Sequence, residues 1–162
     1  MLRQLLVGGA ASLANIAIHA LVMTIVVRVA RANVVQVKTS SSLLLVAVMV
    51  PTVSVLMLTH ACEVLVWSLF YGIFNAAPAG TDLVYFAFVN YTTLGYGDIV
   101  MSPRWRLLGP QEAASGTLAF GWSTAALVTV VIRLFRYRHL ALVGDERRGR
   151  SQETRDPKPA RQ

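Results

Sequence analysis

Residues 92–98, with the sequence TTLGYGD, have the side-chain types needed to present a row of main-chain oxygens to a cation. Consecutive carbonyl groups point toward one axis only if the backbone alternates between ordinary and left-handed conformations, which Gly95 and Gly97 permit at low steric cost. Stacked rings of such carbonyls can replace the hydration shell of an ion. The predicted chemistry is therefore ion coordination, without bond making or breaking.

A second set of polar residues lies inside apolar blocks. His60 and Glu63 are three positions apart, so they share one face of a helix. Helical metal sites use this spacing, but they recruit further ligands from other helices, and the sequence shows no further cluster. We therefore interpret the pair as a structural hydrogen-bonded pair, with a metal site at His60 and Glu63 as an alternative. His19, in another block, is interpreted as a helix-packing contact.

The elements that carry these residues are predicted to lie in a membrane. Of the 162 residues, 55% are hydrophobic and 14% are charged, whereas soluble domains have about 25% charged residues. A membrane-spanning helix needs about 20 apolar residues, and the blocks 5–27, 41–74 and 113–132 satisfy this length. In an alternative interpretation the first block is a signal peptide cleaved near residues 30–32, but the block is longer than the usual ~7–15 residues.

A shorter apolar segment between the second and third blocks is predicted to be a half-length helix over residues 82–92. Thr81 is a good N-cap residue, and Asp82 suits the positive first turn. The segment is too short to cross the membrane and is therefore predicted to be re-entrant, surrounded by protein or water. The negative pole of its dipole then points toward residues 92–98.

The TTLGYGD run, placed after a half-length helix and between two apolar spans, resembles the selectivity filter of the potassium channel family. Trp105, Arg106 and the SGTLAFGWSTAAL segment resemble the start of the inner helix in small bacterial two-helix channels, so the likeness covers about residues 41–133. It implies an all-α membrane protein with three transmembrane helices, a re-entrant pore helix and filter, and four subunits around one pore. Leu94 replaces the commoner valine, a difference that concerns fine selectivity.

The resemblance assigns a role to each filter position. Potassium would bind the carbonyl oxygens of Thr93, Leu94, Gly95 and Tyr96 and the hydroxyl of Thr93, and Gly97 would complete the filter. The side chains of Leu94 and Tyr96 are expected to point away from the axis and to pack against the pore helix. Asp98 would lie at the outer mouth.

The resemblance also implies which residues support the filter and which glycine is the gating hinge. Tyr85 and Thr92 would support the filter, Tyr85 through a hydrogen bond to Asp98. Gly116 or Gly121 would be the gating hinge. By the same likeness, the residues expected to line the cavity after the hinge are Ser123 or Thr124 and Leu127. Apart from the resemblance, the residues expected to form an outer aromatic belt at the membrane interface are Trp67, Phe70, Tyr71 and Trp105.

The charge distribution predicts the orientation. Nine of the 15 Lys and Arg residues follow residue 132 and three lie between residues 28 and 38, whereas residues 75–112 contain two, against three acidic residues. Basic loops remain in the cytoplasm, so the N-terminus is predicted outside and the C-terminus inside a plasma membrane. The small, plain architecture is typical of a bacterial inner-membrane protein. The net charge of +7 therefore does not indicate nucleic-acid binding.

Three regions are predicted: a first span with its cytoplasmic link (1–40), an ion channel pore domain (41–135) and a basic cytoplasmic tail (136–162). From about Gly144 the tail is predicted to be disordered, because it is rich in charge and poor in aromatics. Arg133, Arg136 and Arg138 are expected to contact anionic lipid headgroups.

The predicted function is that of a potassium-selective channel subunit, which is not an enzyme and needs no cofactor beyond K⁺ as the permeant ion. The expected partners are membrane lipids and further copies in a homotetramer, with no nucleic acid and no small-molecule substrate. A non-selective cation channel is the main alternative. A non-conducting membrane protein and a metal protein centred on His60 and Glu63 are the others.

Overall fold

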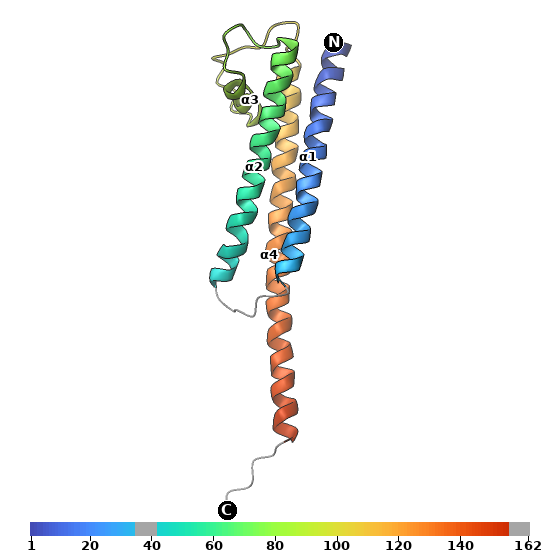
Figure 1. The fold of residues 1–162 in the computed structure, drawn as a ribbon, viewed down its shortest axis with the longest axis vertical. Helices are drawn as coiled ribbons and strands as arrows, with labels where there is room; N and C mark the ends of the chain where they lie inside the picture. The colour runs from blue at the N-terminus through green and yellow to red at the C-terminus, as the bar shows by residue number, and fades with distance from the viewer. Residues whose placement is uncertain (35–41, 156–162) are drawn as a thin grey trace, which may run out of the picture.

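The computed structural model describes residues 1–34 and 42–155, which form four helices and, within these ranges, no strand (Figure 1). The helices are α1 (Leu2–Val34), α2 (Ser42–Phe74), α3 (Leu83–Tyr91) and α4 (Leu108–Arg155). The three long helices form a bundle, and the short α3 lies beside α2 at one end of it. The expected all-α architecture is confirmed.

Three segments are long and apolar enough to cross a membrane: Leu2–Val29, Leu45–Phe74 and Leu108–Arg136. They overlap the three predicted blocks 5–27, 41–74 and 113–132, with ends that differ by up to five residues. Many of their leucine and valine side chains are exposed on the outer faces of the bundle, as expected for helices whose solvent is lipid rather than water.

The short helix α3 begins one residue later than predicted. Its N-cap is Asp82 rather than Thr81, and the Asp82 carboxylate accepts hydrogen bonds from the main-chain N–H groups of Val84 (3.0 Å) and Tyr85 (3.1 Å). A carboxylate satisfies these N–H groups and also complements the positive end of the helix dipole. With nine residues, α3 is about 14 Å long and cannot cross the membrane.

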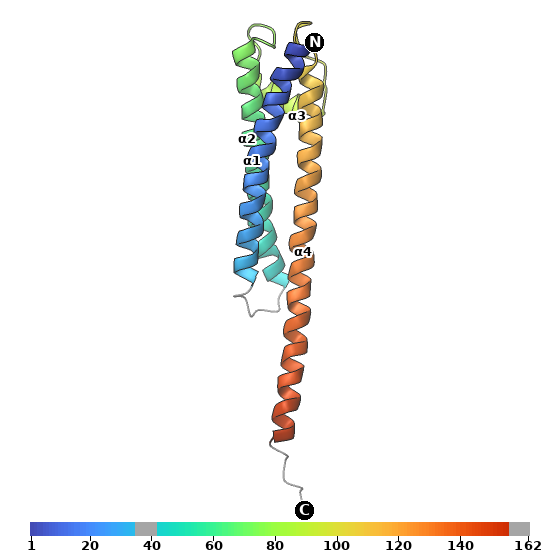
Figure 2. The ribbon, with the colours of Figure 1, turned by 90° about the vertical axis from the view of Figure 1, so that its right-hand side faces the viewer.

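The inner helix α4 is longer than predicted. It has 48 residues, about 72 Å, and continues well beyond the bundle (Figure 2). The prediction of disorder from Gly144 is therefore wrong as far as Arg155. Arg, Glu and Gln are strong helix formers, and a segment that extends an existing helix needs no new nucleus. Residues 156–162 and the Arg138 side chain, for which lipid contact is expected, lie outside what the structure describes.

Buried aromatic side chains join α2, α3 and α4. Trp67 and Tyr71 of α2 are 0% exposed and Trp105 is 3% exposed, and they pack with Phe86 and Tyr91 of α3. The predicted aromatic belt is therefore wrong for these three residues, which face the protein core. Large buried rings contribute much of the apolar area in a core, so this cluster fixes the position of α3 against α2.

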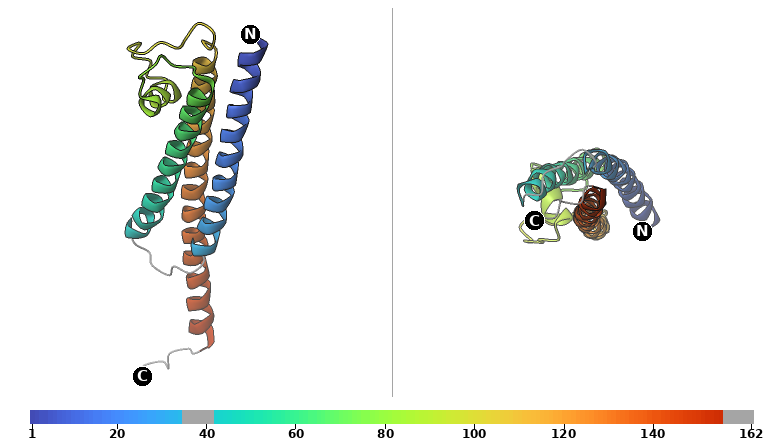
Figure 3. Two further views of the ribbon diagram at one scale, coloured as in Figure 1. Left: turned by 45° about the horizontal axis from the view of Figure 1, so that its top comes forward. Right: turned by 90° about the horizontal axis from the view of Figure 1, so that it is seen from below.

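Helix α1 is an integral part of the bundle. It contacts both α4 and α2, and in the view from below α4 lies on the concave side of an arc formed by α1 and α2 (Figure 3). Two hydrogen bonds join the first half of α1 to the start of α4. The Ser115 hydroxyl donates to the Ser12 hydroxyl at 2.8 Å, and the Gln4 side chain accepts from the N–H of Leu107, directly before α4, at 3.1 Å. The N-terminus lies at the same end as α3, and the C-terminal end of α4, at Arg155, lies at the opposite end.

Candidate functional site

The backbone after α3 alternates between conformations. Thr93, Gly95 and Gly97 have positive φ angles of 60°, 58° and 75°. The expected left-handed conformations at Gly95 and Gly97 are therefore present, and Thr93 adds a third at the same spacing of two. A left-handed threonine costs about 1–3 kcal/mol and persists only where the surroundings impose it. Such strain is typical of a functional segment.

Hydrogen bonds hold this segment by its N–H groups and leave its carbonyls free. The Thr93 N–H donates to the Asn90 carbonyl at 3.0 Å, and those of Leu94 and Gly95 donate to the Val89 carbonyl at 3.0 and 3.4 Å. Within the described residues, no main-chain N–H donates to the carbonyls of residues 93–96. These oxygens are therefore available to a ligand, as cation coordination requires.

The side chains of this segment lie on an open face of the chain. Leu94 is 54% exposed and Tyr96 is 68% exposed. The expectation that they pack against the pore helix is wrong for the helix of the same chain. The segment lies beside α3 at one end of the bundle, and the described residues leave more than half of each of these two side chains uncovered.

Tyr85 and Thr92 occupy supporting positions at the two ends of α3. The Tyr85 hydroxyl donates to the Asp98 carboxylate at 2.7 Å, the predicted contact. This bond raises the pKa of Tyr85, because ionisation would remove the donor and place two negative charges together. Thr92 is the C-cap of α3, and its hydroxyl donates to the Phe88 carbonyl at 2.7 Å. Its side chain therefore supports the helix end rather than the segment that follows.

The two candidate hinge glycines have different surroundings. A Cβ atom at Gly116 would lie 2.1 Å from the main-chain oxygen of Tyr91, whereas a Cβ at Gly121 would meet nothing within 4 Å. Gly116 therefore allows α4 to approach the end of α3. Of the two, only Gly121 lies where the surroundings leave the helix free to bend, and its role as a hinge remains a prediction.

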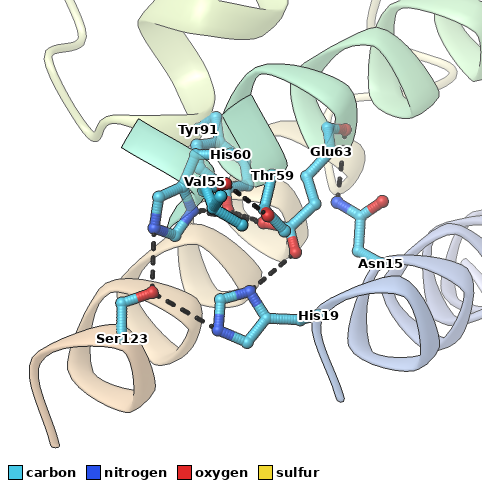
Figure 4. A network of polar contacts seen from close by, with 8 residues as sticks. All are labelled: Asn15, His19, Val55, Thr59, His60, Glu63, Tyr91 and Ser123. Carbon is cyan, nitrogen blue, oxygen red and sulfur yellow. Dashed lines mark hydrogen bonds and ion pairs between the residues drawn. The ribbon is translucent and has the colours of Figure 1, made fainter. Parts of the chain in front are cut away.

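A buried polar cluster lies beside the end of α3, centred on Glu63 (Figure 4). His60 Nδ1 is 3.3 Å from Glu63 Oε2, the predicted pair, and His19 Nδ1 is 2.9 Å from Glu63 Oε1. The interpretation of His19 as a helix-packing contact is therefore confirmed, and the structure adds a hydrogen-bonded carboxylate partner that the sequence did not indicate. Its partner is on another helix, 44 positions away, so helical spacing could not have indicated it. Asn15 adds a hydrogen bond from its Nδ2 to the Glu63 carbonyl at 3.3 Å.

Helices α3 and α4 complete the cluster. The Tyr91 hydroxyl donates to Glu63 Oε2 and lies 3.0 Å from His60 Nδ1. Ser123 Oγ is 3.1 Å from His60 Nε2 and 3.4 Å from His19 Nε2. Ser123 is only 6% exposed, whereas Thr124 next to it is exposed, so Thr124 is the one of these two alternatives that remains a candidate for the cavity lining. All four helices contribute to the cluster.

Glu112 is a further buried carboxylate that the sequence did not indicate. The charge distribution places residues 75–112 outside the membrane, where a carboxylate is expected to be exposed. Glu112 is 0% exposed in α4 and accepts a hydrogen bond from the Tyr71 hydroxyl. Its other oxygen has no partner within the described residues, and neither do the Trp67 ring N–H and the Asn90 amide nitrogen. The feature of the sequence that could have indicated its burial is its position directly before the apolar block 113–132.

Comparison with known proteins identifies the same part of the chain. Residues 59–133, which are 75 of the 162 residues, match the family model described as "Ion channel". No curated protein and no solved structure matches the chain. The matched segment begins in α2, includes α3 and residues 92–98, and ends in α4. The described part of the chain is thus an all-helical membrane protein, and its residues 59–133 are similar to an ion channel family.

Proposed function

We propose that the chain is one subunit of a potassium-selective channel and that the carbonyls of residues 93–96 bind the permeant ion. The observation that carries this proposal is the alternation of left-handed residues at Thr93, Gly95 and Gly97, with the intervening carbonyls free of main-chain hydrogen bonds. A row of unpaired carbonyls is the feature that replaces the hydration shell of K⁺. Permeation then needs no catalytic group and no cofactor.

Four copies of the chain would complete the pore. One chain supplies one row of carbonyls, and a ring of ligands needs several such rows around an axis. Two exposed apolar side chains within the segment support this assembly, because Leu94 is 54% exposed and Tyr96 is 68% exposed. Apolar groups exposed at a functional segment are typical of an interface, and we assign this face to the neighbouring subunits of a homotetramer.

The orientation follows from the fold and the charges together. The filter segment and the N-terminus share one end of the bundle, whereas the basic C-terminal helix leaves from the other. Since basic segments remain in the cytoplasm, the filter faces outward in the plasma membrane of a bacterium. Arg133 and Arg136 then lie at the cytoplasmic interface, where arginines bind anionic lipid headgroups.

Potassium flux into liposomes that contain the purified protein tests this proposal. Gly95→Ala should abolish K⁺ flux and leave membrane insertion intact, because an alanine at φ 58° strains the filter backbone. Gly9→Ala is the matched control: its Cβ would meet nothing within 4 Å and it lies in an ordinary helix. Flux through Gly95→Ala at the level of the native chain would refute the filter assignment. Absence of flux from the folded native chain would favour a non-conducting role.

A further inference from the structure

We propose that His19, His60 and Glu63 form a binding site for a divalent transition metal ion, with Zn²⁺ as the best match, and that this ion ties α1 to the pore domain. Each of the three residues offers one ligand atom, and these atoms lie within 4.8 Å of one another. All three side chains are buried. Metal binding at this site is independent of the proposed conduction.

The donor set and its spacing suit zinc. Two imidazoles and one carboxylate are a common zinc ligand set, usually with one further position open. Bonds of about 2.0–2.1 Å in a tetrahedral site place neighbouring donors about 3.3 Å apart. In this cluster the His19 and His60 Nδ1 atoms lie 2.9 and 3.3 Å from the nearest Glu63 oxygens. Small side-chain movements would bring the three donors around one ion.

When Glu63 is ionised and accepts from Tyr91, and no cation is bound, one histidine nitrogen of the cluster is left without a hydrogen-bond partner. Consider neutral imidazoles and an ionised Glu63, with the Tyr91 hydroxyl donating to Glu63. If His60 carries its proton on Nδ1, both histidine Nε2 atoms need a donor, and the Ser123 hydroxyl has only one proton. If His60 carries it on Nε2, its Nδ1 lone pair faces a carboxylate oxygen at 3.3 Å. A buried polar atom left unpaired costs about 1–3 kcal/mol.

A metal ion removes this conflict. Binding through both Nδ1 atoms requires a proton on each Nε2, and both Nε2–H groups can then donate to Ser123 Oγ, which has two lone pairs. The observed distances of 3.1 Å from His60 and 3.4 Å from His19 fit this arrangement. Tyr91 continues to donate to the carboxylate. Hydrogen bonds from outer groups to the metal ligands are a regular feature of protein metal sites.

A cavity beside the cluster provides the open ligand position. It has a volume of about 300 Å³ and is lined by His19 and Glu63 together with Asn15 and Ser115. Asn15 is 3% exposed, and its Oδ1 has no hydrogen-bond partner within the described residues. A water molecule on the ion at this side would have an acceptor in Asn15 Oδ1.

The position of the site gives it a structural consequence. Its ligands come from α1 and α2, and its outer groups Tyr91 and Ser123 come from α3 and α4. Tyr91 is the last residue of α3, two positions before the left-handed Thr93. A bound ion would therefore hold the first span and the end of the pore helix together.

The test is zinc binding by the purified full chain in detergent, after treatment with a chelator, measured by equilibrium dialysis and metal analysis. We expect one Zn²⁺ per chain, with binding weakened more than tenfold by His19→Ala and about tenfold by Ser123→Ala, since loss of an outer group typically weakens metal binding 10–100-fold. His139→Ala removes the remaining histidine of the chain and is the matched control, expected to bind as the native protein does. Co²⁺ in place of Zn²⁺ should give the visible absorption of a four-coordinate site.

Two results would overturn the site: a folded native chain that takes up no Zn²⁺ and gives no such Co²⁺ spectrum, or equal binding by the native chain and His19→Ala. The first result would leave a shared proton as the cation of the cluster. If His19→Ala does not fold, His19→Gln and the Co²⁺ spectrum of the native chain decide the matter. Binding should persist in the Gly95→Ala variant, so failure of the metal site and failure of the proposed conduction are distinguishable.

Discussion

Alanine at Gly116 should destabilise the protein, whereas alanine at Gly121, five positions further along the same helix, should not. At Gly116 the new Cβ would lie 2.1 Å from the main-chain oxygen of Tyr91 and 3.1 Å from its carbonyl carbon. Both atoms belong to the backbone, so no side-chain rotation relieves the contact. At Gly121 the Cβ would meet nothing within 4 Å.

The two substitutions therefore change the unfolding free energy in opposite directions. Overpacking in a tight interior costs about 1–3 kcal/mol, and a backbone contact of 2.1 Å places Gly116→Ala at the upper end of that range, because α4 must move away from α3. Gly121→Ala relieves the entropic disadvantage of glycine inside a helix, a gain of about 1 kcal/mol. The expected difference between the variants is about 4 kcal/mol.

Thermal and denaturant unfolding of the purified variants in one detergent, followed by circular dichroism, measures this difference. The native chain should lie between the two variants. If Gly116→Ala were as stable as Gly121→Ala, the close approach of α4 to the end of α3 would be wrong, and Gly116 would again be a candidate hinge.

Three further predictions concern single side chains. Tyr85→Phe removes the donor to Asp98 and should speed the slow decline of current during sustained K⁺ conduction, so an unchanged decline rate would remove the basis for this supporting role. Glu63→Ala deprives His19, His60 and Tyr91 of their common acceptor and should lower the unfolding free energy by about 3–5 kcal/mol. Glu63→Gln should cost less, because its amide oxygen still accepts, and equal stability of both variants and the native chain would contradict the network. Asp98→Asn should reduce K⁺ current at low ionic strength and have little effect at high salt, where exposed charges are screened, whereas a reduction independent of salt would contradict an electrostatic role.

Local features of the chain were predictable from the sequence. The three spans and the half-length helix depend on the length and polarity of continuous segments. The left-handed positions at Gly95 and Gly97 follow from residue types that tolerate them. Each of these features is decided by neighbours along the chain, so pattern and spacing were sufficient to find it.

Features that depend on contacts between helices were not predictable in the same way. His19 and Glu63 meet across 44 positions, and Ser123 joins them from a third helix. No periodicity within one helix reports which faces of three apolar helices will meet. For the same reason Trp67 and Tyr71, predicted at the lipid interface, instead lie in the core.

The helical extension of α4 was missed for a different reason, which concerns the interpretation of charge and not contacts between helices. Its charge content alone indicated disorder, but residues 133–155 continue an established helix whose residues have good helical propensity. Charge excludes a packed core for such a segment and does not exclude a helix.

The central claim is that residues 93–96 form a carbonyl-lined filter that selects K⁺, and the reversal potential of the reconstituted native chain tests it most directly. With K⁺ on one side of a planar bilayer and Na⁺ at equal concentration on the other, a selective filter predicts a reversal potential displaced far toward the K⁺ equilibrium value. A reversal potential near zero would show that the pore passes both ions alike, and it would contradict the claim of potassium selectivity.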